Sequence, residues 1–237
     1  MELPCAERLS HLAGRDVLLW CVDLDRYATT VALEGFSSDE QAFAARKVFA
    51  RDRSRYLACR HALRRLLGAS VGLAPADVRI DIDEGGKPVL AGGSPVEFNV
   101  SHSDHVGLIG LSWAYPIGVD IETDRVIDDV ESLVELHFTD GERAECAAAG
   151  SIDHRRFLTC WTRKEAGLKA LGIGLVAEPA TIHTGCAPCT LRTSLETASD
   201  RCEVTVYPVS APSDTLAAVA LAHPADVALA RRSFVPR

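Results

Sequence analysis

The chain has 237 residues, of which 47% are hydrophobic and 24% are charged, and its formal net charge at pH 7 is −8. Such a chain can bury a full hydrophobic core, which excludes an intrinsically disordered protein. The acidic balance argues against a general nucleic-acid binder.

The lack of a recognisable targeting signal and the use of cysteine favour a cytoplasmic protein. No apolar run reaches the length of a membrane span, and the first residues, Met1-Glu2-Leu3-Pro4, do not begin a secretory signal. Eight cysteines are scattered along the chain, which favours reduced, mostly buried thiols over a disulfide framework. The lone Cys186-Ala187-Pro188-Cys189 motif lacks a second pair or nearby histidines, so we interpret it as a loop rather than a zinc or redox site.

Basic residues gather in the segment 46–65. Eight of them lie within twenty positions: Arg46, Lys47, Arg51, Arg53, Arg55, Arg60, Arg64 and Arg65. The ordinary explanation is a solvated helix face, and the functional one is a patch for phosphates or an acidic partner. Only four of the 25 basic residues are lysines, and three of these, Lys87, Lys164 and Lys169, fall inside the motifs described below.

Two segments about one hundred residues apart have similar amphipathic helix patterns. Residues 54–68 form an amphipathic pattern ending at Gly68, and residues 157–172 form another ending at Gly172. The first is followed by expected strands at 78–82, 97–100 and 106–112, and the second by strands at 180–184, 203–207 and 216–222. We therefore predict an α+β fold of two similar halves in a pseudo-twofold arrangement, 1–114 and 115–237, joined near 113–116. A ligand site is expected in the cleft between such halves.

Two polar segments precede this join. The glycines of Gly85-Gly86-Lys87-Pro88 permit a tight turn, with Lys87 expected at a solvated loop tip. The segment Phe98-Asn99-Val100-Ser101-His102-Ser103 reads as a strand that runs into a Ser-His-Ser turn, whose hydroxyls, imidazole and backbone N–H groups suit a phosphate. A polar turn without a ligand is the ordinary alternative, and no G-x-S-x-G motif supports a serine hydrolase.

The run Gly118-Val119-Asp120-Ile121-Glu122 carries two acids in an apolar, β-branched strand. Because Asp120 and Glu122 are two positions apart, they point to the same face of the strand. That face is solvated in most alternating strands. However, a proline and a glycine come just before, and a ligand can approach the backbone closely at a glycine.

The segment 127–149 is acidic and expected to be partly helical, with Thr139-Asp140-Gly141-Glu142 as a capped helix start. Residues 227–237 are expected to fray.

In Trp161-Thr162-Arg163-Lys164-Glu165-Ala166-Gly167-Leu168-Lys169, Glu165 and Lys169 are four positions apart and share a helix face. On a surface helix such a pair is ordinary. If this helix meets the strand bearing Asp120 and Glu122, three carboxylates and an ammonium converge, which suits Mg²⁺ and phosphate oxygens. From the residues alone, the best hypothesis is a Mg²⁺-dependent phosphohydrolase.

Taken together and in this order, the motifs resemble one family, the Sfp-type 4′-phosphopantetheinyl transferases. The matching segments are Gly86-Lys87-Pro88, Phe98-Asn99-Val100-Ser101-His102-Ser103, Gly118-Val119-Asp120-Ile121-Glu122 and Trp161-x-x-Lys164-Glu165-x-x-x-Lys169. The resemblance covers roughly residues 40–175 and implies the family's fold, a pair of similar α+β halves in one monomeric chain.

The resemblance implies an enzyme that moves the 4′-phosphopantetheine arm of coenzyme A to a serine of an acyl or peptidyl carrier protein, releasing adenosine 3′,5′-bisphosphate. Carriers of fatty-acid, polyketide and nonribosomal-peptide synthesis are the family's usual acceptors. Neither nucleic acid nor membrane is an expected partner. The alternatives are a coenzyme A-binding module without transfer and the phosphohydrolase described above.

The resemblance also assigns roles to residues. The metal ligands for Mg²⁺, or alternatively Mn²⁺, would be Asp120, Glu122 and Glu165. Glu165 would also accept the serine proton, Lys169 would stabilise the pyrophosphate, and His102 would assist. The coenzyme A contacts would be Arg46, Arg55, Lys87, Pro88, Ser101, His102 and Lys169, with Arg46 and Arg55 as candidates for the 3′-phosphate.

Overall fold

A computed structural model describes residues 3–9, 17–32, 34–83, 85–148, 150–173, 177–196, 201–223 and 227. The chain divides into two compact units, Met1–Asp81 with Pro88–Ala114, and Ile82–Lys87 with Tyr115–Arg237. Each unit combines helices with an antiparallel sheet, so the predicted α+β class is confirmed. None of the helices in the described ranges is long and apolar enough to cross a bilayer.

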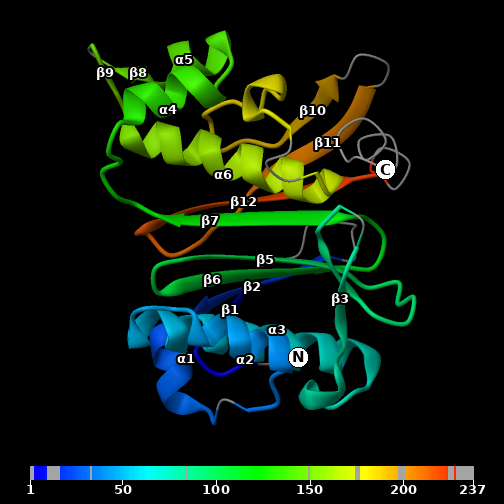
Figure 1. The fold of residues 1–237 in the computed structure, drawn as a ribbon. Coiled ribbons are helices and arrows are strands. Elements are labelled where there is room, and N and C mark those ends of the chain that lie inside the picture. The colour runs from blue at the N-terminus through cyan, green and yellow to red at the C-terminus, as the bar shows by residue number, and fades with distance from the viewer. Residues whose placement is uncertain are drawn as a thin grey trace. The chain divides into compact units, whose positions relative to one another are not determined.

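The first unit is built on a four-stranded antiparallel sheet in the order β1-β2-β6-β5 (Figure 1). Its elements are β1 (Ala6–Leu9), β2 (Val17–Asp23), α1 (Leu24–Thr30), α2 (Ser38–Ala45), α3 (Ala50–Val71), a 3₁₀ turn (Pro75–Asp77), β5 (Glu97–Ser103) and β6 (Val106–Ser112). A small hairpin joins β3 (Ile80–Ile82) to β4 (Pro88–Leu90), and its tip, residues 82–87, is part of the second unit.

The core of the first unit lies between α3 and this sheet. Leu63 and Leu66 of α3 are buried in one apolar cluster with Trp20 of β2 and Phe98 of β5. Strand β6 is buried at all seven positions, as expected for an apolar strand between two neighbours. The 22-residue helix thus gains its stability from this packed face rather than from propensity alone.

The second unit has a four-stranded antiparallel sheet in the order β10-β11-β12-β7. Its elements are β7 (Ile117–Thr123), α4 (Val130–His137), α5 (Asp140–Cys146), β8 (Ala147–Ala148), β9 (Ser151–Ile152), α6 (His154–Leu171), a 3₁₀ turn (Pro179–Thr181), β10 (Leu191–Glu196), β11 (Arg201–Pro208) and β12 (Thr215–Ala222). Helix α6 lies across β7, β12 and β11 (Figure 1). Leu168 and Leu171 of α6 are buried in one cluster with Val204 and Ala218 of the sheet.

The two units share the order of three of their four strands. In the first, β6 lies between β2 and β5, and in the second, β12 lies between β7 and β11, with every pair antiparallel. The corresponding strands β2 and β7 begin one hundred positions apart, at Val17 and Ile117. In each half, two short helices separate this strand from the long helix, which is followed by a 3₁₀ turn that begins at a proline. The sequence repeat therefore has a structural counterpart, and β2, which was not predicted, belongs to it.

One of the two predicted helix ends was wrong. Helix α6 does end at Gly172, which has φ of 72°, but α3 continues through Gly68 to Gly72, which has φ of 75°. Gly68 is needed for a different reason. A Cβ atom there would lie 2.5 Å from the Leu73 carbonyl oxygen, where the chain folds back after the helix.

Four other predictions concern single segments of the chain. The strand expected at 180–184 is instead a 3₁₀ turn followed by a single bridge from Ile182 to Leu195. The Ser-His-Ser segment is the end of β5, and the turn follows at Asp104–His105, where Asp104 has φ of 49°. The capped helix start at Thr139 is confirmed, including its reciprocal hydrogen bonds with Glu142. The expected fraying of 227–237 lies, apart from Val227, outside the described residues.

Candidate active site

Asp120 lies on β7 and is buried. Asp120 is 4% exposed, which overturns the ordinary expectation that this acid lies on a solvated strand face. Its Oδ1 accepts a hydrogen bond of 2.6 Å from the Lys169 ammonium of α6. The strand and the helix that carry the two motifs are therefore brought together, as the candidate site requires.

Gly118 allows this contact because it lets α6 approach β7 closely. A Cβ atom at Gly118 would lie 2.0 Å from the Ala166 carbonyl oxygen and 2.4 Å from the Ala170 backbone nitrogen. We expected a ligand to approach the backbone at this glycine, but the group that approaches it is the backbone of α6. Ala166 and Ala170 are small and one helical turn apart, which is the sequence signal that could have identified the contact.

Helix α6 presents Glu165 and Lys169 on the same face. The Lys169 Nζ atom is 3.6 Å from Glu165 Oε2, and the side chains are 12% and 26% exposed for Glu165 and Lys169 respectively. This is a half-buried pair rather than the surface pair of an ordinary helix. With Asp120 it forms a cluster of two carboxylates around one ammonium, which we call the Asp120–Lys169–Glu165 cluster.

The electrostatics of this cluster favour a cation. Burial alone would lower the pKa of Lys169, but the charge and hydrogen bond of Asp120, together with Glu165, raise it above its ordinary value. Lys169 is therefore an ammonium throughout the neutral range. Glu165 Oε1 is buried and has no hydrogen-bond partner within the described parts of the chain. A buried carboxylate oxygen in that condition is costly unless a cation or a proton donor satisfies it.

Glu122 is oriented differently. Its Oε2 accepts a hydrogen bond of 2.7 Å from Arg125 Nη1, and its side chain is 20% exposed. Among the described residues, no group of three or more histidine, cysteine, aspartate or glutamate side chains is arranged to hold a metal ion. The physical reason is that Asp120 and Glu165 converge on Lys169, whereas Glu122 pairs with Arg125. The three-carboxylate metal site thus stays a prediction.

The sequence predicts Lys87 at a solvated loop tip, and this prediction is wrong. It is 8% exposed, and its Nζ donates a hydrogen bond of 2.9 Å to the carbonyl oxygen of Ile117, the first residue of β7. Asp83 shapes the turn by accepting hydrogen bonds from the backbone of Gly85 and Lys87, and Gly86 has φ of 82°. The turn thus holds Lys87 against the strand that carries Asp120.

The remaining predicted contacts lie in the first unit. Pro88 begins β4, and Ser101 and His102 lie near the end of β5, paired with Leu108 and Gly107 of β6. Ser101 is half-buried and His102 is exposed. Arg46 caps the end of α2, where its guanidinium lies 5.0 Å from the centre of the Phe43 ring.

Arg55 is held by two carboxylates. It donates to both carboxylate oxygens of Asp25, at 2.7 and 2.6 Å, and to Asp104. The hydrogen bond to Asp25 raises the pKa of Arg55, and the same bond lowers that of Asp25. Arg55 is 8% exposed, so the expectation of a solvated face fails here.

Other members of the basic run are also engaged. Arg60 and Arg64 both bind Glu40, with Nε–Oε distances of 2.7 and 2.8 Å, and Arg64 is 3% exposed. These contacts join α2 to α3. The run of eight basic residues is therefore partly neutralised within the protein, which could not be predicted from local sequence.

Lys164 is structural. It is fully buried, and its Nζ lies 2.7 Å from Glu142 Oε2 and donates to the carbonyl oxygens of Pro179 and Ile182. Burial would raise the pKa of Glu142, but the Lys164 charge and several hydrogen bonds lower it to about 2. Lys164 thus anchors α6 to α5, one residue before Glu165.

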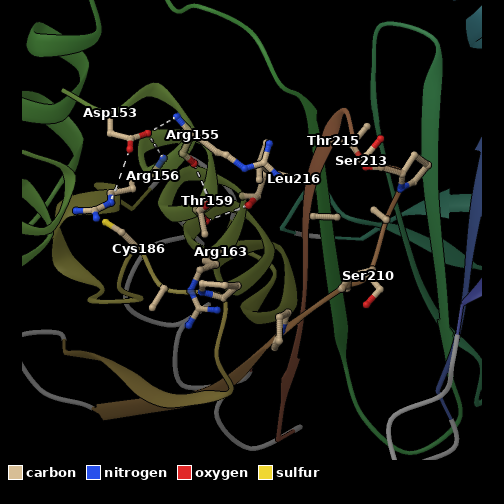
Figure 2. A pocket seen from close by; sticks show the side chains of 18 of the residues that line it. Asp153, Arg155, Arg156, Thr159, Arg163, Cys186, Ser210, Ser213, Thr215 and Leu216 are labelled. Atoms are coloured by element: carbon tan, nitrogen blue, oxygen red, sulfur yellow. Dashed lines mark hydrogen bonds and ion pairs between the residues drawn. The ribbon is translucent and has the colours of Figure 1, made fainter. Parts of the chain in front are cut away.

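A cavity of about 820 Å³ lies in the second unit, and it is distinct from the cluster. It is lined by the N-terminal half of α6, by the loop around Cys186, and by residues 208–217. Figure 2 shows Arg155, Thr159 and Arg163 reaching into this region from the helix. None of the residues predicted for the site lines this cavity.

Comparisons with known proteins agree with the motif order. The family described as 4′-phosphopantetheinyl transferase superfamily matches residues 116–211, and the 4′-phosphopantetheinyl transferase N-terminal family matches residues 25–111. The chain is 33% identical over 199 residues to 4′-phosphopantetheinyl transferase HetI of Nostoc sp., which covers 77% of this chain and 84% of that protein.

Two further relatives match shorter parts. A phosphopantetheinyl transferase of Thraustochytrium sp. is 35% identical over 164 residues, 62% of this chain and 57% of the relative. The 4′-phosphopantetheinyl transferase AcpT of Salmonella typhimurium is 40% identical over 90 residues, 38% of this chain and 47% of the relative. With the match to HetI extending over most of both proteins, this chain belongs to the 4′-phosphopantetheinyl transferase superfamily.

Proposed function

We propose that this enzyme transfers the 4′-phosphopantetheine arm of coenzyme A to a serine hydroxyl of an acyl or peptidyl carrier protein. In the reaction the serine oxygen forms a bond to the β-phosphorus of coenzyme A. The bond from that phosphorus to the bridging oxygen breaks, and adenosine 3′,5′-bisphosphate leaves. The Asp120–Lys169–Glu165 cluster carries the proposal, because it joins a half-buried cation to two carboxylates in a chain of this superfamily.

Glu165 is the proposed proton acceptor. Its Oε1 is buried and has no hydrogen-bond partner in the described ranges, so it can receive the proton of the carrier serine, directly or through one water. Lys169 can donate hydrogen bonds to the pyrophosphate and stabilise the negative charge that develops as the bond breaks. Asp120 orients Lys169 by accepting its 2.6 Å hydrogen bond.

The chemical type of the donor set also suits a divalent cation. Asp120, Glu122 and Glu165 supply the carboxylate oxygens that Mg²⁺ prefers, and Mn²⁺ is an alternative. The buried Glu165 Oε1 is an oxygen that such an ion would satisfy. Bound there, the ion would neutralise negative charge on the phosphates of coenzyme A. Glu122 would have to exchange its hydrogen bond with Arg125 for this role.

Coenzyme A contacts are proposed for Lys87, Pro88, Ser101 and His102, with His102 also assisting catalysis. For the 3′-phosphate, Arg46 is a better candidate than Arg55. All three donor nitrogens of Arg55 already bind Asp25 or Asp104, so a phosphate would have to displace a carboxylate. Arg46 is exposed at the end of α2.

The proposal is tested by intact-mass spectrometry of purified apo carrier domains. Fatty-acid, polyketide and nonribosomal-peptide carriers are each incubated with the enzyme, coenzyme A and Mg²⁺, with and without a chelator. We expect one carrier class or more to gain one phosphopantetheine, and the gain to disappear with chelator. The carrier with its serine changed to alanine is the control and should gain nothing.

Two other outcomes would contradict the proposal. Tight coenzyme A binding with no modification of any carrier would indicate a binding module. Breakdown of coenzyme A in the absence of carrier, with water as the acceptor, would indicate a phosphohydrolase. Analysis of the nucleotide products by chromatography distinguishes these two results.

Lys169→Ala should affect catalysis more than binding. Without the ammonium, the developing charge loses a hydrogen-bond donor, and we expect kcat to fall by roughly 100-fold, while the Kd for coenzyme A changes by a factor of about three or less. Steady-state kinetics and calorimetric titration measure the two quantities. Arg192→Ala, which removes a surface cation paired with Glu203, is the control. A variant that loses only affinity would show that Lys169 has no transition-state role.

A further inference from the structure

Three buried cysteines from separate elements of the second unit converge at one point. Cys146 ends α5, Cys160 lies in α6, and Cys186 lies in the loop after Thr184 and Gly185. The Sγ atoms of Cys146 and Cys186 are 3.1 Å apart, and the Cys160 Sγ atom lies 4.0 Å from the hydroxyl of Thr184, two residues before Cys186. A disulfide needs an S–S distance of about 2.05 Å, so a shift of roughly 1 Å would join the first two.

The backbone around this pair is already held together. Glu142 Oε1 accepts hydrogen bonds from the backbone N–H groups of Thr184 and Gly185, at 2.7 and 3.1 Å. The N–H group of Cys186 donates to Glu145 Oε2 at 2.7 Å. Because these bonds tie the loop to α5, the two sulfur atoms are kept adjacent in the folded state.

Only one of the three thiols opens onto the cavity. Cys186 is 7% exposed and lines the 820 Å³ cavity, whereas Cys146 and Cys160 are fully buried. Figure 2 shows Cys186 at the cavity wall beside Arg156. A small oxidant that enters the cavity can therefore reach Cys186 and not the other two.

The neighbouring thiols favour the thiolate of Cys186, which is the reactive form, whereas the Glu142 carbonyl oxygen, 3.6 Å from its Sγ atom, accepts a hydrogen bond from the thiol form. Hydrogen bonds from the Cys146 and Cys160 thiols lower the pKa of Cys186, against burial and the Glu145 and Glu142 carboxylates. The buried Arg163 guanidinium is close enough for its charge to interact with that of Cys186. In contrast, the hydrogen bond with Cys186 and burial raise the pKa of Cys146.

We propose that Cys186 is a hydroperoxide-sensitive thiol and that Cys146 captures its oxidised form as a disulfide. The Cys186 thiolate attacks one peroxide oxygen, the O–O bond breaks, and Cys186 becomes a sulfenic acid while water or an alcohol leaves with a proton. The Cys146 sulfur then attacks the sulfenic sulfur. The S–S bond forms, the S–O bond breaks, and the hydroxide leaves as water with the thiol proton of Cys146.

This assignment differs from the usual interpretation of a Cys-x-x-Cys motif. Cys189 is exposed, and its carbonyl oxygen is held by Arg163 Nη1 at 2.8 Å. The sulfur that the structure places against Cys186 is that of Cys146, 40 positions earlier in the chain. The inference does not depend on the proposed transferase reaction, because none of these cysteines belongs to the Asp120–Lys169–Glu165 cluster.

The test treats the reduced, full-length protein with hydrogen peroxide. We expect the native protein to lose the mass of two hydrogen atoms, and non-reducing peptide mapping to find Cys146 linked to Cys186. Because folding holds the two sulfur atoms together, the link should form at least tenfold faster than in guanidinium-unfolded protein. Cys189→Ser is the matched control and should form the same link at the same rate.

A second variant separates the two steps. In Cys146→Ala the link cannot form, so dimedone should trap a sulfenic acid at Cys186. Three results would overturn the proposal. They are a Cys186–Cys189 disulfide in the wild type, dimedone labelling of another cysteine before Cys186, and equal rates of disulfide formation in native and unfolded protein. The wild-type map and the comparison of rates remain decisive even if Cys146→Ala does not fold.

Discussion

Asp120→Asn is expected to lower kcat/KM for carrier modification by roughly 10²–10³-fold, in line with the loss of one preorganised electrostatic group. The substitution keeps the size of the side chain and removes its charge. Lys169 then faces a neutral amide in place of the carboxylate that orients it at 2.6 Å, and the donor set proposed for Mg²⁺ loses one carboxylate. The measurement is carrier modification at several Mg²⁺ concentrations, with coenzyme A binding followed separately.

The control for this variant is Asp140→Asn, which makes the same chemical change in the first turn of α5 at a fully exposed side chain. It should retain wild-type kinetics. Thermal unfolding of both variants checks that lost activity is not lost folding. If Asp120→Asn were folded and retained activity within about threefold of the wild type, the cluster would not be the active site.

Part of the candidate site follows from local spacing. Glu165 and Lys169 share a helix face because they are four apart, whereas Glu122, two positions from Asp120, pairs with Arg125 instead of joining them. The meeting of strand and helix is nonlocal. It depends on Gly118 facing the backbone of Ala166 and Ala170, and although small residues in both segments are compatible with a close approach, their spacing alone does not say that the two segments pair with each other.

Pairings between distant segments account for most of what sequence could not predict. Lys164 and Lys169 stand five positions apart in one helix, but one is buried against Glu142 and the other reaches Asp120. Arg55 looks like its basic neighbours until Asp25 and Asp104 are brought beside it by the fold. Whether a charge is available to a ligand is decided by such partners.

The fold was predicted best where periodicity is strong and less well elsewhere. Strand β6 was placed correctly at Val106–Ser112, and α6 ended where expected, at Gly172. Strand β2, a continuous apolar run at Val17–Asp23, was missed because a short run of this kind does not distinguish a buried strand from a helix segment. Its pairing with β6 makes it part of the repeated unit.

The buried pair between Glu142 and Lys164 is expected to make stability depend on acid pH. The pKa of Glu142 is lowered from 4.5 to about 2 in the folded state. The contribution of ionised Glu142 to the free energy of unfolding is therefore fully present above about pH 4.5 and is lost as the pH falls toward 2. A difference of this size corresponds to about 3 kcal/mol of unfolding free energy. Urea unfolding of the wild type and Glu142→Gln at pH 7 and pH 3 measures it.

Glu142→Gln and a matched control variant isolate the effect of Glu142 ionisation on stability. Glu142→Gln should be much less stable than the wild type at pH 7, and the difference should narrow at pH 3, where part of the wild-type contribution has been lost. Glu131→Gln, at an exposed position of α4, should track the wild type at both pH values. A difference that stays constant with pH would show that the ionisation of Glu142 contributes no stability.

Lys164→Met separates the role of this pair from that of the Asp120–Lys169–Glu165 cluster. Removing one partner leaves the other charge buried, which typically costs about 3–5 kcal/mol, so this variant should be severely destabilised. Combining it with Glu142→Leu removes both charges, and much of the lost stability should return because no unpaired charge remains. Lys164 anchors α6, the helix that carries Glu165, through its contact with Glu142. Activity should therefore recover along with stability in the double variant. Asp120→Asn, in contrast, should stay inactive even when it is folded, and this contrast distinguishes a structural charge from a catalytic one.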